Sequence, residues 1–269
     1  MSAILLAGRF LFPFDDGKYL DDPNWRYASR WLVFWGLVIG AVYAVVFRGA
    51  WRWFGEYEKL RLVPVAVILS IDLGWCGYRL ISSVAIVLAS RNQQNDIMKL
   101  DVSVLVFVLI IVIFKLALLL SLPMGGRVWP ADWRNHFWPL YPYVTYRPLI
   151  LMPLWGRWAM MLAIIIGRIA PADTSRLRRM AEGTNLVFIM FYWLLCSGLT
   201  VVYCSADVKH IPLGIVIALG IMVVTYLTSF FLARRFAGQT ELTLGVTGLV
   251  GELAFLVFYQ PFARYIYWY

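Results

Sequence analysis

The sequence predicts an all-α polytopic integral membrane protein with about seven transmembrane helices in one bundle. Three observations support this. The 269 residues are 62% hydrophobic and 14% charged, with a mean hydropathy of +0.74, whereas a soluble domain carries about 25% charged residues. The apolar residues fall in long runs, each near the length that crosses a bilayer. No polar stretch is long enough to be a linker, so residues 1–269 are expected to form a single transmembrane domain.

The chain begins with an interfacial segment rather than a span. The run SAILLAGRFLF contains Arg9 and is followed by Pro13, which predicts a half-helix or an interfacial helix without the features of a secretory signal. The segment 1–30 is also acidic, because four aspartates lie close together between its apolar start and the first span.

Seven apolar runs follow and define a helix bundle over residues 31–262. The expected spans cover residues 31–47, 63–89, 102–122, 148–169, 185–204, 211–233 and 245–262. The second run is interrupted by polar residues and glycines, which predicts a kinked or broken crossing. After the last run, residues 263–269 form an aromatic tail typical of a membrane interface.

The basic residues of the loops favour a cytoplasmic N-terminus. Twelve Lys and Arg residues lie in the loops on the N-terminal side and nine on the other, and basic residues concentrate on the cytoplasmic side. The lipid bilayer is the expected partner, and the bacterial cytoplasmic (inner) membrane is the expected location. The net charge of +9 is spread over short loops, so it indicates headgroup anchoring and no nucleic acid. A homo-oligomer is also considered.

Four of the fifteen acidic residues lie in the loop FPFDDGKYLDD at 12–22. Carboxylates spaced around a glycine can bind a divalent cation, which can bridge phosphate oxygens. The alternative is a solvated loop, because Asp-Gly and Asp-Pro-Asn are ordinary turn sequences. Both interpretations stay open.

Several charged residues stand inside apolar runs, where an isolated charge is unfavourable and usually faces a cavity or a partner. Asp72 and Arg79 are seven residues apart on one helix face, which predicts a mutual ion pair or charges that face protein packing. Lys115 is the only charge of the third span, which favours a buried acidic or phosphate partner. Arg157 stands between two tryptophans, as in an interfacial belt or an anion site.

Two further segments combine basic residues with turn signals. PADTSRLRRMAEG at 171–183 predicts a short surface helix that ends at Gly183, with arginines that meet lipid phosphate or substrate. RRFAGQTELTLGVTGLVGE at 234–252 has arginines, glycines and polar groups that suit an anion or a metal. The same glycines also suit close helix packing. The sequence contains no His/Cys metal cluster, P-loop or dinucleotide fingerprint.

Five segments resemble, in sequence and order, the cobalamin synthase family, the adenosylcobinamide-GDP ribazoletransferases. They are RYASRWLVFWGLVIGAVYAVV (26–46), NDIMK (95–99), FKLALLLSLP (114–123), LMPLWGRWAMMLAIIIGRIAP (151–171) and ARRFAGQTELTLG (233–245). The fourth is similar to a Pro-x-x-Gly-Arg-Trp-Ala-Met segment of that family. The resemblance extends from about residue 5 to residue 258.

The chain departs from the family where the family has its acidic motif, His-x-Asp-Gly-x-x-Asp-x-x-Asp-Gly. The corresponding place reads DLGWCGYRLISSVAIVLASRNQQND, in which Asp72 is the only acid of the core. The Lys-Asp-Ser of the family reads Lys99-Leu100-Asp101, and the aspartate of its Thr-Gly-Asp is replaced by a displaced Glu241.

The resemblance implies a Mg²⁺-dependent phosphotransfer that joins the corrinoid adenosylcobinamide-GDP to α-ribazole and releases GMP. The candidate catalytic residues are Arg157, Lys115 and Lys99, and the candidate phosphate-binding residues are Arg234, Arg235 and Thr240. Arg157 and Lys115 are carried over by motif. The candidate Mg²⁺ ligands are Asp15, Asp16, Asp21, Asp22, Asp96, Asp101 and Glu241. The N-terminal aspartates among them would replace the missing motif.

Two other classes of function remain open. One is a relative that kept the fold and lost the reaction, and that binds a corrinoid or assembles with a membrane partner. The other is a small-substrate transporter, suggested by the interrupted second span with its Asp72/Arg79 pair.

Overall fold

The fold is all-α, as the sequence predicts. The computed structural model describes residues 1–12, 19, 22–54, 62–76, 81, 83–84, 102–122, 146–170, 175–204 and 211–266. Over these residues the backbone is almost entirely helical, and the β-pairing is one isolated parallel bridge between Ile169 and Gln239.

The helices follow the predicted spans closely. In chain order they are α1 (Ala3–Leu11), α2 (Trp25–Ala28), α3 (Leu32–Phe54), α4 (Leu62–Ile71), α6 (Val102–Leu120), α7 (Tyr146–Ile165), α8 (Ser175–Gly183), α9 (Leu186–Cys204), α10 (Ile211–Arg235) and α11 (Glu241–Ile266). A 3₁₀ turn (Ser29–Trp31) joins α2 to α3, and a π-helical segment (Asp72–Cys76) follows α4. The last helix continues to Ile266, beyond the expected end of the bundle at 262.

Five helical stretches of the described chain are long and apolar enough to cross a membrane. They are Trp25–Phe54, Tyr146–Ile165, Leu186–Cys204, Ile211–Arg235 and Glu241–Pro261. Shorter apolar helices, Leu62–Gly74 and Leu105–Leu120, stand where the second and third spans are expected. The protein is therefore a polytopic integral membrane protein. The predicted interruption of the second span coincides with the change from α-helix to π-helix at Asp72.

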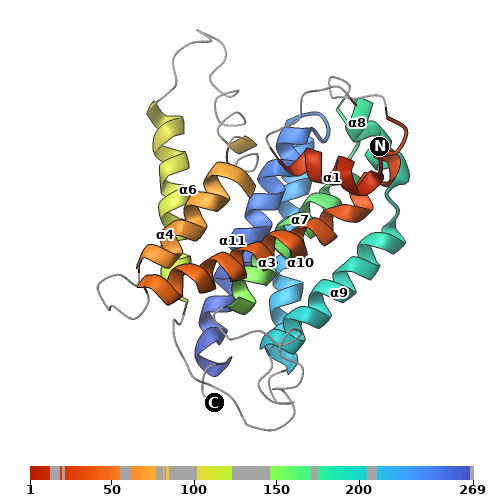
Figure 1. Cartoon of the computed structure of the whole chain (residues 1–269). Helices are drawn as coiled ribbons and strands as arrows, with labels where there is room; N and C mark the ends of the chain where they lie inside the picture. The colour runs from red at the N-terminus through yellow and green to blue at the C-terminus, as the bar shows by residue number, and fades with distance from the viewer. Residues whose placement is uncertain are drawn as a thin grey trace.

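Helix α7 is the centre of the bundle. Its membrane-spanning window is 83% buried, against 22% for α9, and it packs most extensively against α3 and α11. Figure 1 shows α7, drawn in green, among α3, α10 and α11. Its sequence has no polar face, which is typical of a helix that is surrounded by protein.

Glycines let α3 and α11 approach the backbone of α7. A Cβ atom on Gly40 of α3 would lie 2.6 Å from the carbonyl oxygen of Ile150, and one on Gly36 would lie 2.9 Å from the Cα atom of Leu154. On the other side, a Cβ atom on Gly251 of α11 would lie 3.2 Å from the carbonyl oxygen of Trp155. Small residues four apart are a common means of close helix packing in membranes.

The N-terminal helices gather with α8 at one end of the bundle, near the label N in Figure 1. Gly183 touches the backbone of Arg26, and the hydroxyl of Thr184 bonds that of Ser29 at 2.7 Å. The nine residues of α1 span about 13 Å, too short to cross a hydrocarbon core of about 30 Å. The predictions of a half-helix at the start of the chain and of a helix ending at Gly183 are confirmed.

We expect Gly40→Ala to destabilise the protein by about 1–3 kcal/mol, because the new methyl group would clash with rigid backbone. The matched control is Gly49→Ala in the same helix, where nothing lies within 4 Å of the added Cβ. That change should leave stability unchanged or raise it by up to about 1 kcal/mol. Thermal unfolding in detergent checks both, and equal melting temperatures for the two variants would contradict the packing described for α3 and α7.

Candidate functional site

A buried ion cluster lies at the core of the bundle, centred on Lys115 of α6. Its ammonium donates hydrogen bonds of 2.6 Å to Oδ2 of Asp72 and 2.6 Å to Oε2 of Glu252. The three side chains are each 1% exposed. A lysine held between two carboxylates in this way gains charge-assisted hydrogen bonds that offset its removal from water.

Two more side chains complete the cluster. The hydroxyl of Tyr43, on α3, donates to the other oxygen of Asp72 at 2.5 Å. Nη1 of Arg157, on α7, lies 3.6 Å from Oε1 of Glu252. Two cations and two carboxylates therefore neutralise one another. Each of the five residues comes from a different segment, so the cluster connects α3, the π-helical segment, α6, α7 and α11.

The local structure explains how the charges meet. On α6 the outward face carries exposed apolar residues such as Leu109 and Ile113, whereas Lys115 and Leu119 are buried one turn apart. On α11, Glu252 lies against Gly156, where a Cβ atom would come 2.5 Å from its Cγ atom. A side chain at that position would push Glu252 away from Lys115 and Arg157.

The cluster confirms one prediction about the buried charges and corrects another. Lys115 has buried acidic partners, as expected. Asp72 pairs with Lys115 and Tyr43, while Arg79 lies outside the described residues. Arg157 does not lie in an interfacial belt with its neighbouring tryptophans, because its side chain is 1% exposed in the middle of the most buried helix.

The buried carboxylates of the ion cluster do not fit a Mg²⁺ site. Lys115 occupies the position between Asp72 and Glu252 in which a divalent cation could otherwise bridge them. Over the part of the chain that the structure describes, no group of three or more His, Cys, Asp or Glu residues could hold a metal ion.

Two of the predicted metal ligands are described, and both pair with cations. Asp22 accepts a hydrogen bond from the Met1 ammonium at 2.8 Å and another from the Asn24 backbone, and these hold the pKa of Asp22 below its ordinary value. Both carboxylate oxygens of Glu241 accept hydrogen bonds from Arg176 of α8. Their role as metal ligands stays a prediction. The predicted site residues that lie outside the described part of the chain are Asp15, Asp16, Asp21, Asp96, Lys99 and Asp101.

The Arg176–Glu241 pair and the Ile169–Gln239 bridge bring α8, the end of α7 and the α10–α11 turn to one end of the bundle. The N-terminal helices lie there too, since Arg176 also stacks 5.9 Å from the ring of Trp25. Segments that are far apart in the sequence therefore meet at this end of the bundle.

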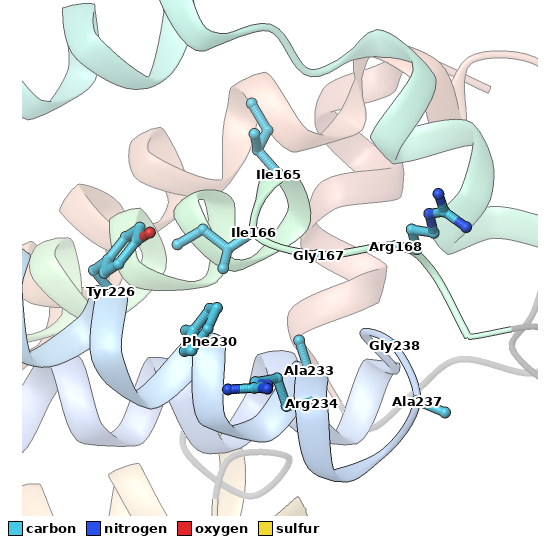
Figure 2. Close-up of a pocket in the computed structure, with 10 residues that line it drawn as sticks. All are labelled: Ile165, Ile166, Gly167, Arg168, Tyr226, Phe230, Ala233, Arg234, Ala237 and Gly238. Atoms are coloured by element: carbon cyan, nitrogen blue, oxygen red, sulfur yellow. The ribbon is translucent and has the colours of Figure 1, made fainter.

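A pocket of about 540 Å³ lies at this end, between the end of α7 and the last turns of α10. Figure 2 shows Arg168 on one wall and Arg234 on the other, with the rings of Tyr226 and Phe230 along α10. Of the predicted phosphate-binding residues, only Arg234 lines the pocket. Thr240 instead caps α11, where it and Thr243 exchange side-chain to backbone hydrogen bonds of 2.9 and 3.2 Å.

Sequence reasoning missed Glu252, Tyr43 and Gln239. Glu252 is an isolated acid inside an apolar span, and an isolated charge in such a span usually has a buried partner. This signal could have identified it. Tyr43 and Gln239 carry no comparable signal, because both side chains are uncharged and the rule for intramembrane charges does not cover them.

Comparison with protein families identifies the chain. A family model described as CobS, cobalamin-5-phosphate synthase, matches residues 91–260, well over half of the length. The chain belongs to the cobalamin-5-phosphate synthase family. Searches of curated proteins and of solved structures found no significant match. A function in cobalamin synthesis follows from the family, as does a corrinoid substrate.

The family match and the ion cluster overlap in part. Lys115, Arg157 and Glu252 lie within the matched residues, whereas Tyr43 and Asp72 lie before them. The match begins at residue 91, near the end of the segment in which the acidic motif of the family is missing. The carboxylate at the start of this segment, Asp72, is one of the two that hold Lys115.

We expect Lys115→Met to destabilise the protein by about 3–5 kcal/mol, because two buried carboxylates would face each other with Arg157 as the one nearby cation of the cluster. Adding Asp72→Asn to that variant restores electrical neutrality and should recover more than half of the loss. Chemical or thermal unfolding in detergent measures both. Equal losses in the single and double variants would show that packing, not charge, explains the effect.

Proposed function

We propose that this membrane protein is a ribazoletransferase of cobalamin assembly. In this reaction a hydroxyl of α-ribazole attacks the corrinoid-linked phosphorus of adenosylcobinamide-GDP. The new oxygen–phosphorus bond forms as the bond to the leaving GMP breaks, and the hydroxyl proton passes to a base or to water. One observation carries the proposal: Lys115 and Arg157, which match the family in separate segments, meet at a single carboxylate, Glu252.

The ion cluster acts by positioning in this proposal. Lys115 and Arg157 both pair with Glu252 in the protein interior, so in this proposal they fix the relative placement of α6, α7 and α11 rather than contact the substrate. Mg²⁺ would screen the pyrophosphate charge. Its proposed ligands are the aspartates of the N-terminal loop, of which only Asp22 is among the described residues, and those of the segment before α6, which lie outside them.

The basic end of the bundle supports an anionic substrate. Arg168, Arg178, Arg234 and Arg235 are exposed there, on segments that the Arg176–Glu241 pair and the Ile169–Gln239 bridge hold together. Such a concentration of positive charge attracts a pyrophosphate and raises its local concentration. We propose that this end faces the cytoplasm of a bacterium, with the protein in the inner membrane. The N-terminus lies at the same end.

One observation favours a second candidate, a corrinoid-binding relative without turnover. The two carboxylates described in the protein core are both neutralised by cations of the same chain, and the acidic motif of the family is absent from the sequence. The transporter alternative rests on an Asp72–Arg79 pair. Because Asp72 is held by Lys115 and Tyr43, no described contact favours it.

Ribazole transfer in membranes that contain the protein tests the proposal. Adenosylcobinamide-GDP, α-ribazole and Mg²⁺ are supplied, and the corrinoid product and GMP are followed. We expect product that falls at least about tenfold in Asp15→Asn/Asp16→Asn and on chelation of Mg²⁺. Glu182→Gln, which removes an exposed acid of α8, is the matched control and should keep full activity.

Retention of the coloured corrinoid on the purified protein separates the two candidates. Bound corrinoid without GMP release, from folded and inserted protein, would establish the non-catalytic relative. Neither turnover nor retention would reject both.

A further inference from the structure

The pocket beside α10 opens where the helix changes from apolar to basic. Helix α10 is apolar from Ile211 and ends with Arg234 and Arg235, a change expected at the boundary between hydrocarbon and headgroups. Tyr226 and Phe230, one turn apart, are 50% and 38% exposed on its outer face. Their rings stack 6.4 Å apart and nearly parallel, so they form an apolar surface that leads from the bilayer side into the pocket.

The pocket carries positive charge at its polar end. The guanidinium of Arg234 lies 5.4 Å from the ring centroid of Phe230. Arg168 lines the pocket from the loop after α7, and its guanidinium points away from that of Arg234 (Figure 2). Both side chains are exposed, and no carboxylate among the described residues forms an ion pair with either. The adjacent Arg235 is also exposed but does not line the pocket.

The walls are held together by contacts that are already formed. The backbone N–H of Gln239 donates to the carbonyl of Arg168 at 2.7 Å, and the N–H of Ala170 donates back at 2.9 Å. The buried side-chain amide of Gln239 donates to the carbonyls of Ile166 at 2.8 Å and Ser229 at 3.1 Å. One residue thus fixes the loop after α7 against the end of α10, so the pocket does not have to be assembled when a ligand binds.

Two glycines allow this close contact. Gly238 has a φ of 142°, and a Cβ atom there would lie 2.6 Å from the backbone nitrogen of Ala170. Gly167 has a φ of 95°, and a Cβ atom there would lie 2.8 Å from the Cβ of Ala233. Both positions need backbone conformations that other residues rarely adopt.

We propose that this pocket binds an anionic phospholipid, with the headgroup phosphate at the end that carries Arg234 and Arg168 and an acyl chain along Tyr226 and Phe230. The arrangement matches both parts of such a molecule, because basic groups stand at the polar end and an exposed aromatic surface continues toward the hydrocarbon. A soluble phosphate would use the arginines and leave the aromatic surface without a role. The proposal uses two of the four arginines that attract the anionic substrate in the proposed reaction, so lipid retention tests it and ribazole transfer does not.

Lipid retention by the purified full-length protein tests it. The protein is titrated in detergent with phosphatidylglycerol or phosphatidylcholine, and bound lipid is counted by native mass spectrometry. We expect a preference for phosphatidylglycerol. Arg168→Gln and Arg234→Gln should each weaken its apparent affinity about fivefold, since a basic residue near an anionic headgroup contributes on that scale. Arg168 and Arg234 are exposed, as is Arg235 of the control variant, so their substitution should not change folding. Melting temperatures measured without lipid check this.

Arg235→Gln is the matched control, because it removes the same charge one residue away from the pocket. Unchanged retention in this control, with losses in the other two variants, supports the proposal. An equal loss in all three would show general attraction to a basic surface and would overturn it. Inorganic pyrophosphate is added as a competitor. The lipid proposal would also be overturned if pyrophosphate displaced the lipid with the same affinity that it shows for the lipid-free protein. That result would assign the site to a soluble phosphate compound.

Discussion

The ammonium of Lys115, held at 2.6 Å from both Asp72 and Glu252, is the interaction on which the arrangement of the bundle depends. A lone charge at membrane depth is strongly unfavourable, and each of these three groups would be such a charge without the others. Gln260 of α11 also donates to the carbonyl of Leu118 on α6 at 2.9 Å, while the outward face of α6 is exposed and apolar. Its place beside α11 and the π-helical segment therefore follows from where its lysine can be neutralised.

Close backbone packing around α7 makes the cluster possible. Gly36 and Gly40 bring α3 against one side of α7, and Gly156 leaves room for Glu252 on the other. Arg157 follows Gly156 directly, so the residue that permits the approach of α11 also sets the distance between Arg157 and Glu252. Packing and charge thus support each other. Wider spacing would weaken the ion pairs, and unpaired charges would disfavour the tight helix contacts.

The same arrangement bears on the chemistry of the family. A cation of the chain itself already stands between the two buried carboxylates, so these acids stabilise the fold and are not free to bind a metal. Four exposed arginines lie away from this cluster, at the end of the bundle where the end of α7, α8 and the α10–α11 turn meet. In the proposed function the interior of the bundle positions the helices and the basic end attracts the anionic substrate.

The sequence by itself determined the helices, since each span is a local run of apolar residues whose length suits a bilayer, and the observed bounds agree within a few residues for five of the seven. It also predicted that Lys115 has a buried acidic or phosphate partner. Only the tertiary structure decided which acids serve, because Glu252 is 137 residues away and hydrophobic periodicity is a local signal. The burial of Arg157 was decided in the same way. An arginine between two tryptophans has the same sequence pattern at a membrane interface and in a protein core. The core location is shown only by the packing of α3 and α11 against α7.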